Sequence, residues 1–184
     1  MFILYAIPIG IIAGYALGGR LERLGDLRFA WAWLAVAGLL VQVVLFAGPV
    51  AEVVGAAGPP IYMASTAAVL VAVLRNWSIP GMVLVVLGAA SNLAAIVANG
   101  GVMPASPEAV TALGMEDGPG FSNSVVMTDP ALRPLTDIFA LPPWLPLSNV
   151  FSIGDVLIGV GVALVIALGM RLTVAVRPST PPHG

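Results

Sequence analysis

The sequence has no cysteine, no lysine and one histidine in 184 residues. The absence of cysteine excludes disulfides, thiolate metal sites, thiol nucleophiles and lipidation on cysteine. The histidine, His183, lies in the terminal tail, so histidine-based metal centres and serine–histidine catalysis are excluded as well. We therefore expect neither a metal site nor a cofactor.

Charge is also scarce. Only 9% of the residues are charged and 59% are hydrophobic, whereas soluble domains carry about 25% charged residues. The seven basic residues are dispersed arginines, so no stripe for binding nucleic acid exists. This composition cannot cover a globule in water and predicts a chain whose main partner is the lipid bilayer.

The apolar residues form five blocks, each close to the length of a membrane-spanning helix. The blocks lie near residues 2–18, 29–49, 59–74, 78–98 and 153–176. The third block is the shortest. No polar stretch could fold alone, so we predict one membrane domain over residues 1–184, an all-α integral membrane protein with five transmembrane helices.

The arginines predict the orientation. Arg20, Arg23, Arg28 and Arg75 fall in connections on one side of a five-span alternation, and Arg171 and Arg177 close the last span on that same side. By the positive-inside rule this side is the cytoplasm. We expect the N-terminus outside and the C-terminus inside. The first block has no basic region before it and no cleavage site after it, so we expect it to be retained.

The long connection, residues 99–150, falls outside in this scheme. It holds eight prolines together with many apolar residues, so it is too broken for continuous helix and too apolar for a disordered linker. We expect an ordered proline-rich cap at the membrane interface, with Phe121, Phe139, Trp144 and Leu145 buried against the helix ends or in lipid. One short helix is predicted, with Ser106 as N-cap and Pro107 first, running to Met115.

Small and polar residues inside the blocks have structural interpretations. Gly10, Gly14 and Gly18 put a bare stripe on one helix face, which favours packing within the bundle over a dimer contact. Gln42, Ser91 and Asn92 are expected to form hydrogen bonds between helices.

Two aspartates are candidate functional residues. Asp155 begins the fifth block, where an ionisable group is either functional or, with Ser152 three residues earlier, part of a capping box. Asp137 lies among apolar residues eighteen positions earlier. A loop turned by prolines can bring the two carboxylates together, and a close pair shares a proton, as aspartic peptidases require.

The stretch from Asp137 to Gly161 resembles the C-terminal part of lipoprotein signal peptidase, or signal peptidase II. Its Phe151-Ser152-Ile153-Gly154-Asp155 matches the family's second catalytic element, with Ile158 and Gly161 at matching offsets. The resemblance implies an intramembrane aspartic dyad of Asp137 and Asp155, with Asn123 upstream, acting on a lipidated peptide. The chain departs from that family in having Ser152 for asparagine and five predicted spans for four.

The whole chain resembles a group of small bacterial membrane proteins of unknown function. The similarity is carried by the run from Asn99 to Pro104 and by the stretch from Asn149 to Asp155. This resemblance implies the bacterial cytoplasmic membrane and supplies no activity. Two functions stay open: an accessory subunit whose outer cap docks onto a membrane-protein partner, and a signal-peptidase-II-like peptidase or an inactive relative that binds lipid or lipopeptide.

Overall fold

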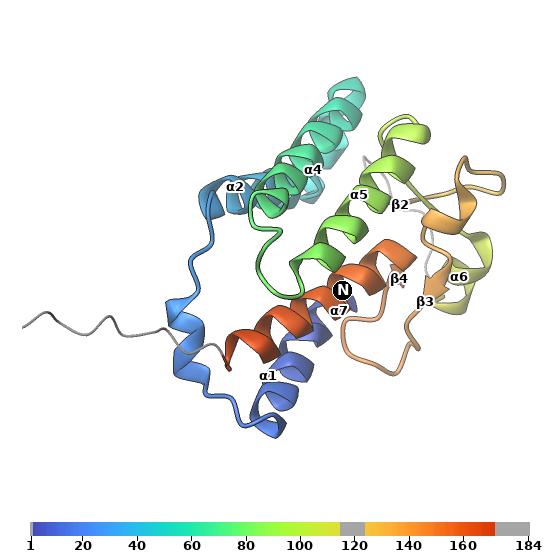
Figure 1. Ribbon diagram of the computed structural model, residues 1–184. Helices are drawn as coiled ribbons and strands as arrows, with labels where there is room; N and C mark the ends of the chain where they lie inside the picture. The colour runs from blue at the N-terminus through green and yellow to red at the C-terminus, as the bar shows by residue number, and fades with distance from the viewer. Residues whose placement is uncertain (1, 115–123, 172–184) are drawn as a thin grey trace, which may run out of the picture.

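Helices dominate the computed structural model, which describes residues 2–114 and 124–171 (Figure 1). This confirms the predicted helical class in its coarse form. The long helices are α1 (Ala6–Ala16), α2 (Ala32–Leu45), α4 (Gly58–Leu74), α5 (Met82–Ala98) and α7 (Ile153–Gly169).

The shorter elements lie between the long helices and before α1. They are η1 (Phe2–Tyr5), η2 (Leu21–Asp26), α3 (Gly48–Val53), η3 (Gly55–Ala57), α6 (Pro107–Ala112) and η4 (Arg133–Leu135), with the strands β1 (Met103–Ala105), β2 (Ser124–Val126), β3 (Phe139–Ala140) and β4 (Val150–Phe151). The strands form two small sheets, β1–β2 and β3–β4, which the all-α expectation did not include.

Each long helix is centred on one of the five apolar blocks, but most are shorter than the block. In the second block, α2 ends at Leu45 and a separate short helix, α3, follows. In the fourth block, α5 begins only at Met82, because Gly81 before it adopts a left-handed φ of 91°. Within residues 2–114 and 124–171, one helix is long and apolar enough to cross a membrane, Gly55–Leu74, which contains the third and shortest block. Shorter apolar helices cover Phe2–Ala16, Ala32–Leu45, Met82–Ala98 and Ile153–Gly169.

The long helices form a row in the order α2, α4, α5, α7, α1, since contacts join each to the next. Neighbours in the row alternate in direction, except that α1 runs parallel to α7, with Gly10 beside Ala163 and Gly14 beside Met170. Along the helix axes, the row therefore has two ends. At one end of the row, α1, α4 and α7 end and α2 and α5 begin. The opposite end carries residues 99–114 and 124–152, which we call the cap (Figure 1).

Glycines set the distance between α5 and α7. A Cβ on Gly88 would lie 2.3 Å from the Gly154 carbonyl oxygen, and one on Gly81 would lie 2.7 Å from that of Gly161. On the other face of α7, Gly10 and Gly14 are packed just as tightly, which agrees with the predicted packing within the bundle, whereas nothing lies within 4 Å of a Cβ on Gly18.

Two of the three polar side chains that were predicted to form hydrogen bonds between helices form them. Gln42 Nε2 on α2 donates to Thr66 Oγ1 on α4 at 3.2 Å, and Asn92 on α5 bonds to α7. Ser91 was predicted to do the same, and this was wrong: its buried hydroxyl has no hydrogen-bond partner among the described residues.

The cap rests on the helix ends through an apolar cluster. Leu45, Tyr62, Ile96 and Met103 are buried together there, and Leu135 from η4 packs against them. The predicted short helix appears as α6, with the Ser106 hydroxyl accepting from Ala109 N at 3.0 Å, as expected for an N-cap. It ends at Ala112, and Met115 lies outside the described residues.

Candidate functional site

Asp137 is a buried carboxyl where the cap meets the helices, with 5% of its surface exposed. Its backbone is fixed beside β1, because Asp137 N donates to Pro104 O and Ser106 N donates to Asp137 O, both at 2.9 Å. Among the described residues, its side chain accepts a hydrogen bond from Ser124 Oγ to Oδ2 at 2.8 Å. The carboxyl is thus held rigidly and nearly out of water.

Burial raises the pKa of the Asp137 carboxyl to about 7, because the charged form loses its hydration. The Ser124 hydrogen bond opposes this shift by favouring the ionised form, and the negative charge of Asp155 adds to it. Asp137 therefore changes charge near neutral pH. Strongly raised carboxyl pKa values are a common property of acid–base and binding sites.

Asp155 lies in the first turn of α7, and both its oxygens have donors. Oδ2 accepts from Ser152 N at 3.1 Å, while Ser152 Oγ accepts from Asp155 N at 3.0 Å, which completes the capping box that the sequence suggested. Oδ1 accepts from Asn92 Nδ2 at 2.8 Å, and Ser152 Oγ donates to Asn92 Oδ1 at 2.9 Å. Asn92, Ser152 and Asp155 thus form a closed ring that fastens α5 to the start of α7.

Gly154 makes that ring possible. A Cβ at this position would lie 1.9 Å from Asn92 Oδ1. Three of the four residues from Ser152 to Asp155 therefore have a structural explanation: a cap, a glycine that leaves room for Asn92, and a carboxylate that anchors the facing helix.

The structure brings Asp137, Asp155 and Tyr62 to one region of the cap boundary. The two carboxylates interact electrostatically, and the buried Tyr62 hydroxyl on α4 interacts with both of them. Both aspartates are described, and no hydrogen bond joins their carboxylates directly; each accepts from other groups instead. Asn123, the third predicted site residue, lies outside the described residues.

Sequence reasoning missed Tyr62. It stands in an apolar helix seventy-five positions before Asp137, and one tyrosine among apolar residues carries no signal of a distant carboxylate. A buried tyrosine does require a partner for its hydroxyl, which could have marked the residue for attention but not its location.

A second feature is the amide clamp of Asn99, at the end of α5. Asn99 Oδ1 accepts from Ala131 N and Nδ2 donates to Ala131 O, both at 2.9 Å, and Nδ2 also donates to Ala95 O at 2.8 Å. One side chain thus fixes both backbone groups of Ala131 to the helix end. The clamp orients the turn that follows.

That turn presents Leu132, which is 48% exposed and has a left-handed φ of 54°. Left-handed backbone costs a residue other than glycine about 1–2 kcal/mol, and strained positions concentrate at binding and catalytic sites. Beside the turn is a pocket, to which neither aspartate contributes. It is lined by Ser106, Pro107, Glu108, Met127, Thr128, Pro130, Arg133 and Thr136.

Residues 26–167 match the model of a family described as "Family of unknown function (DUF5317)". The chain belongs to this family. The predicted similarity to an uncharacterised group is thereby confirmed, and the family supplies no activity. No curated protein and no solved structure matches the chain.

The matched DUF5317 region contains both segments that carried the similarity. In this structure both segments attach the cap to the helices. Asn99 forms hydrogen bonds with Ala131, and Ser152 and Asp155 form them with Asn92. Gly101 packs against Pro59 so closely that a Cβ added to the glycine would lie 2.5 Å from the Pro59 Cβ. Asn99, Ser152 and Asp155 in these segments therefore join the cap to the helices.

Proposed function

We propose that this DUF5317 chain is an integral membrane protein of five crossing helices, with its N-terminus and cap outside and its C-terminus in the cytoplasm of a bacterial cell. The supporting observation is the exposure of large apolar side chains along helices that bear no charge after their first turn, for example Ile12 at 69%, Trp33 at 70% and Val43 at 68%. A water-soluble surface rarely exposes contiguous apolar area on this scale.

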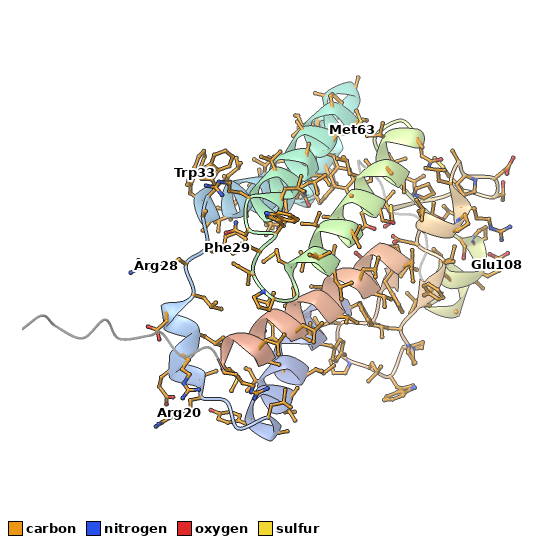
Figure 2. The ribbon with its side chains drawn as sticks, viewed as in Figure 1. Arg20, Arg28, Phe29, Trp33, Met63 and Glu108 are labelled. Atoms are coloured by element: carbon orange, nitrogen blue, oxygen red, sulfur yellow. The ribbon has the colours of Figure 1, made fainter. Side chains whose placement is uncertain are left out.

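The ends of the helix row support the same proposal. Arg20, Arg28 and Trp33 lie at one end and Glu108 on the cap at the other (Figure 2). All four tryptophans are exposed: Trp31, Trp33 and Trp77 at the arginine end, and Trp144 in the cap. Tryptophan is enriched at both membrane–water interfaces and arginine on the cytoplasmic side. Helices α4, α5 and α7 have 17 residues each, which makes them about 25 Å long, so with their adjoining turns they fit a hydrocarbon core of about 30 Å.

Within the membrane we propose an accessory role, in which the cap docks onto a partner membrane protein through the turn from Asp129 to Arg133 and the adjoining pocket. The observation that carries this is the exposed, strained Leu132 on a turn that Asn99 fixes at both backbone groups of Ala131. A rigid apolar side chain beside an exposed arginine and a polar pocket has the composition of a protein-docking surface.

The test is Leu132→Asn, because asparagine tolerates the left-handed conformation better than leucine. We expect the thermal unfolding temperature to stay level or rise, while a complex extracted from native membranes with mild detergent is lost. Leu147→Asn is the matched control, since Leu147 is also exposed, at 56%, with a left-handed φ of 57°. Loss of the complex in both variants, or in neither, would contradict docking through this turn.

The second candidate is a signal-peptidase-II-like peptidase or an inactive relative that binds a lipidated peptide. It is favoured by the raised pKa of Asp137, to which the charge of Asp155 contributes, since a dyad needs one carboxyl that keeps its proton. Against it stands the occupation of both Asp155 oxygens by Asn92 and Ser152. We therefore rank it below the accessory role.

A double-mutant cycle decides between them. Asp137→Asn, Asp155→Asn and the double variant are compared by thermal unfolding, with cleavage of a lipidated peptide as a second readout. A dyad predicts coupling well above the roughly 0.5 kcal/mol error of additivity and loss of cleavage in each single variant. Stability effects that add, with no cleavage by the parent protein, would eliminate the peptidase.

A further inference from the structure

The hairpin of β3 and β4 holds a loop, residues 141–149, that is free of charge and projects apolar side chains. No charged residue occurs between Asp137 and Asp155. Trp144 at the loop is 79% exposed, and Phe139 beside it is 41% exposed. An exposed loop in water is normally polar, because solvated turns have nothing to gain from apolar side chains.

The loop is fixed on the flank of the helices rather than above their ends. The Tyr5 hydroxyl, just before α1, donates to Pro146 O. Phe2 stacks on Phe151 with ring centroids 4.5 Å apart, and Phe139 lies 5.4 Å from Phe151 on the neighbouring strand. The loop is thereby held beside the first turn of α1, whose outward residues Ile9 and Ile12 are exposed.

The backbone of the loop suits a poorly hydrated place. Three of its residues, Pro142, Pro143 and Pro146, have no N–H to leave unpaired. Leu141 N donates to Asn149 O and Leu145 N to Pro142 O, both at 3.0 Å. Irregular backbone is excluded from the hydrocarbon core because of its unpaired groups, so this loop fits the headgroup boundary and not the core.

We propose that residues 141–149 form a lipid-interface anchor, in which Trp144 inserts between headgroups and acyl chains of the leaflet at the cap end. The occupant is lipid because the loop continues the exposed apolar flank of α1, carries no charge to pair with a protein, and presents tryptophan, the residue favoured at this depth. The inference rests on the proposed membrane location.

The absence of native cysteine allows a direct test. Single-cysteine variants Trp144→Cys and, on the same loop, Leu147→Cys are labelled with a nitroxide in purified protein reconstituted into phosphatidylcholine–phosphatidylglycerol vesicles. Collision rates are measured with oxygen, which concentrates in lipid, and with a water-soluble nickel chelate. Asp129→Cys, at an exposed carboxylate of the cap, is the aqueous control, and Val43→Cys on the exposed face of α2 is the lipid control.

We expect the ratio of the oxygen collision rate to the nickel collision rate to be several-fold higher for labels at 144 and 147 than for the label at 129. Loop labels that match position 129, while position 43 remains lipid-exposed, would overturn the anchor and leave the membrane proposal intact. A label at 43 that is also open to nickel would instead reject the membrane location. Shielding at 144 in native membranes but not in pure lipid vesicles would assign the loop to a protein partner and overturn the anchor.

Discussion

Asp137 should make stability depend on pH. In the folded protein its pKa is about 7, against an ordinary value of 3.8, so between these values the folded state keeps a proton that the unfolded state has lost. Stability therefore falls as pH rises from about 4 to 7, by at most about 1.4 kcal/mol per pH unit, and the contribution is constant outside that window. Asp137→Asn imitates the protonated form and should remove this dependence.

The measurement is thermal unfolding in one detergent at several pH values. At pH 8 the Asp137→Asn variant should unfold at a higher temperature than the parent protein, and the difference should shrink steadily as the pH falls from 7 toward 4. Asp129→Asn, which alters an exposed cap carboxylate, should follow the parent throughout. An Asp137→Asn curve parallel to the parent's would show that the buried carboxyl is not the titrating group.

Residue roles that depend on near neighbours in the chain could be predicted from the sequence. The N-cap of Ser106 and the capping box of Ser152 and Asp155 both act across three residues, so the spacing alone reveals them. The partner of Asn92 could be predicted only in kind, as another helix. Tyr62 beside the aspartates and the Asn99 clamp on Ala131 depend on how distant segments meet, which no local spacing encodes.

At the scale of elements, α5 and α7 should be sensitive to any added side-chain atom at their contact. Gly154→Ala would drive a Cβ into Asn92 Oδ1, and Gly88→Ala would drive one into the Gly154 carbonyl. Rigid overpacking costs about 1–3 kcal/mol, so each variant should unfold several degrees below the parent protein. Gly25→Ala is the control, because nothing lies within 4 Å of its Cβ and its φ is not left-handed. Equal unfolding temperatures for all three variants would show that the helices are not in close contact.

Two asparagines at opposite ends of the row use the same geometry. Asn76 pairs with both backbone groups of Ala30 and with Ala72 O, as Asn99 pairs with Ala131 and Ala95 O. Each change to alanine should cost about 1–3 kcal/mol, because backbone groups lose their partners. The positional effects should differ: limited proteolysis should accelerate within residues 124–149 only for Asn99→Ala. Equal cleavage of the cap in both variants would show that Asn99 is not what holds it.

The elements themselves were predictable to the extent that composition defines them. The apolar blocks located every long helix. They did not predict that α2 ends at Leu45 or that α5 begins at Met82, because hydropathy does not reveal the local turns at these positions. The strands of the cap were missed since β1 and β2 are three residues each, too short for alternation to show, and β1 contains Pro104. Their pairing is parallel and depends on the surrounding cap.

For the whole molecule, the distribution of charge and exposure distinguishes the two ends of the helix row. Arg20, Arg23, Arg28, Arg75 and Arg171 belong to one end, and Arg133 is the arginine of the described cap. Among described residues the one ion pair is Arg20–Glu22, with both side chains exposed, so charge contributes little to folding. Under the membrane proposal, the asymmetric distribution of the arginines matters instead for orientation.

The proposed orientation determines on which side of the membrane the cap could meet a partner. Reporter enzymes that are active on one side of the membrane only, fused after Arg28, Arg75 or Gly114, should report cytoplasm for the first two and the outside for the third. The five-arginine end retains positive charge and resists translocation, whereas the cap end does not. Removing charge tests whether the arginines determine the orientation. Replacing Arg20, Arg23 and Arg28 together with glutamine should yield a mixture of the two orientations, while Arg133→Gln should leave the orientation unchanged. A cytoplasmic signal after Gly114 in the parent chain would reverse the topology and contradict the proposed outer location of the cap and its docking turn.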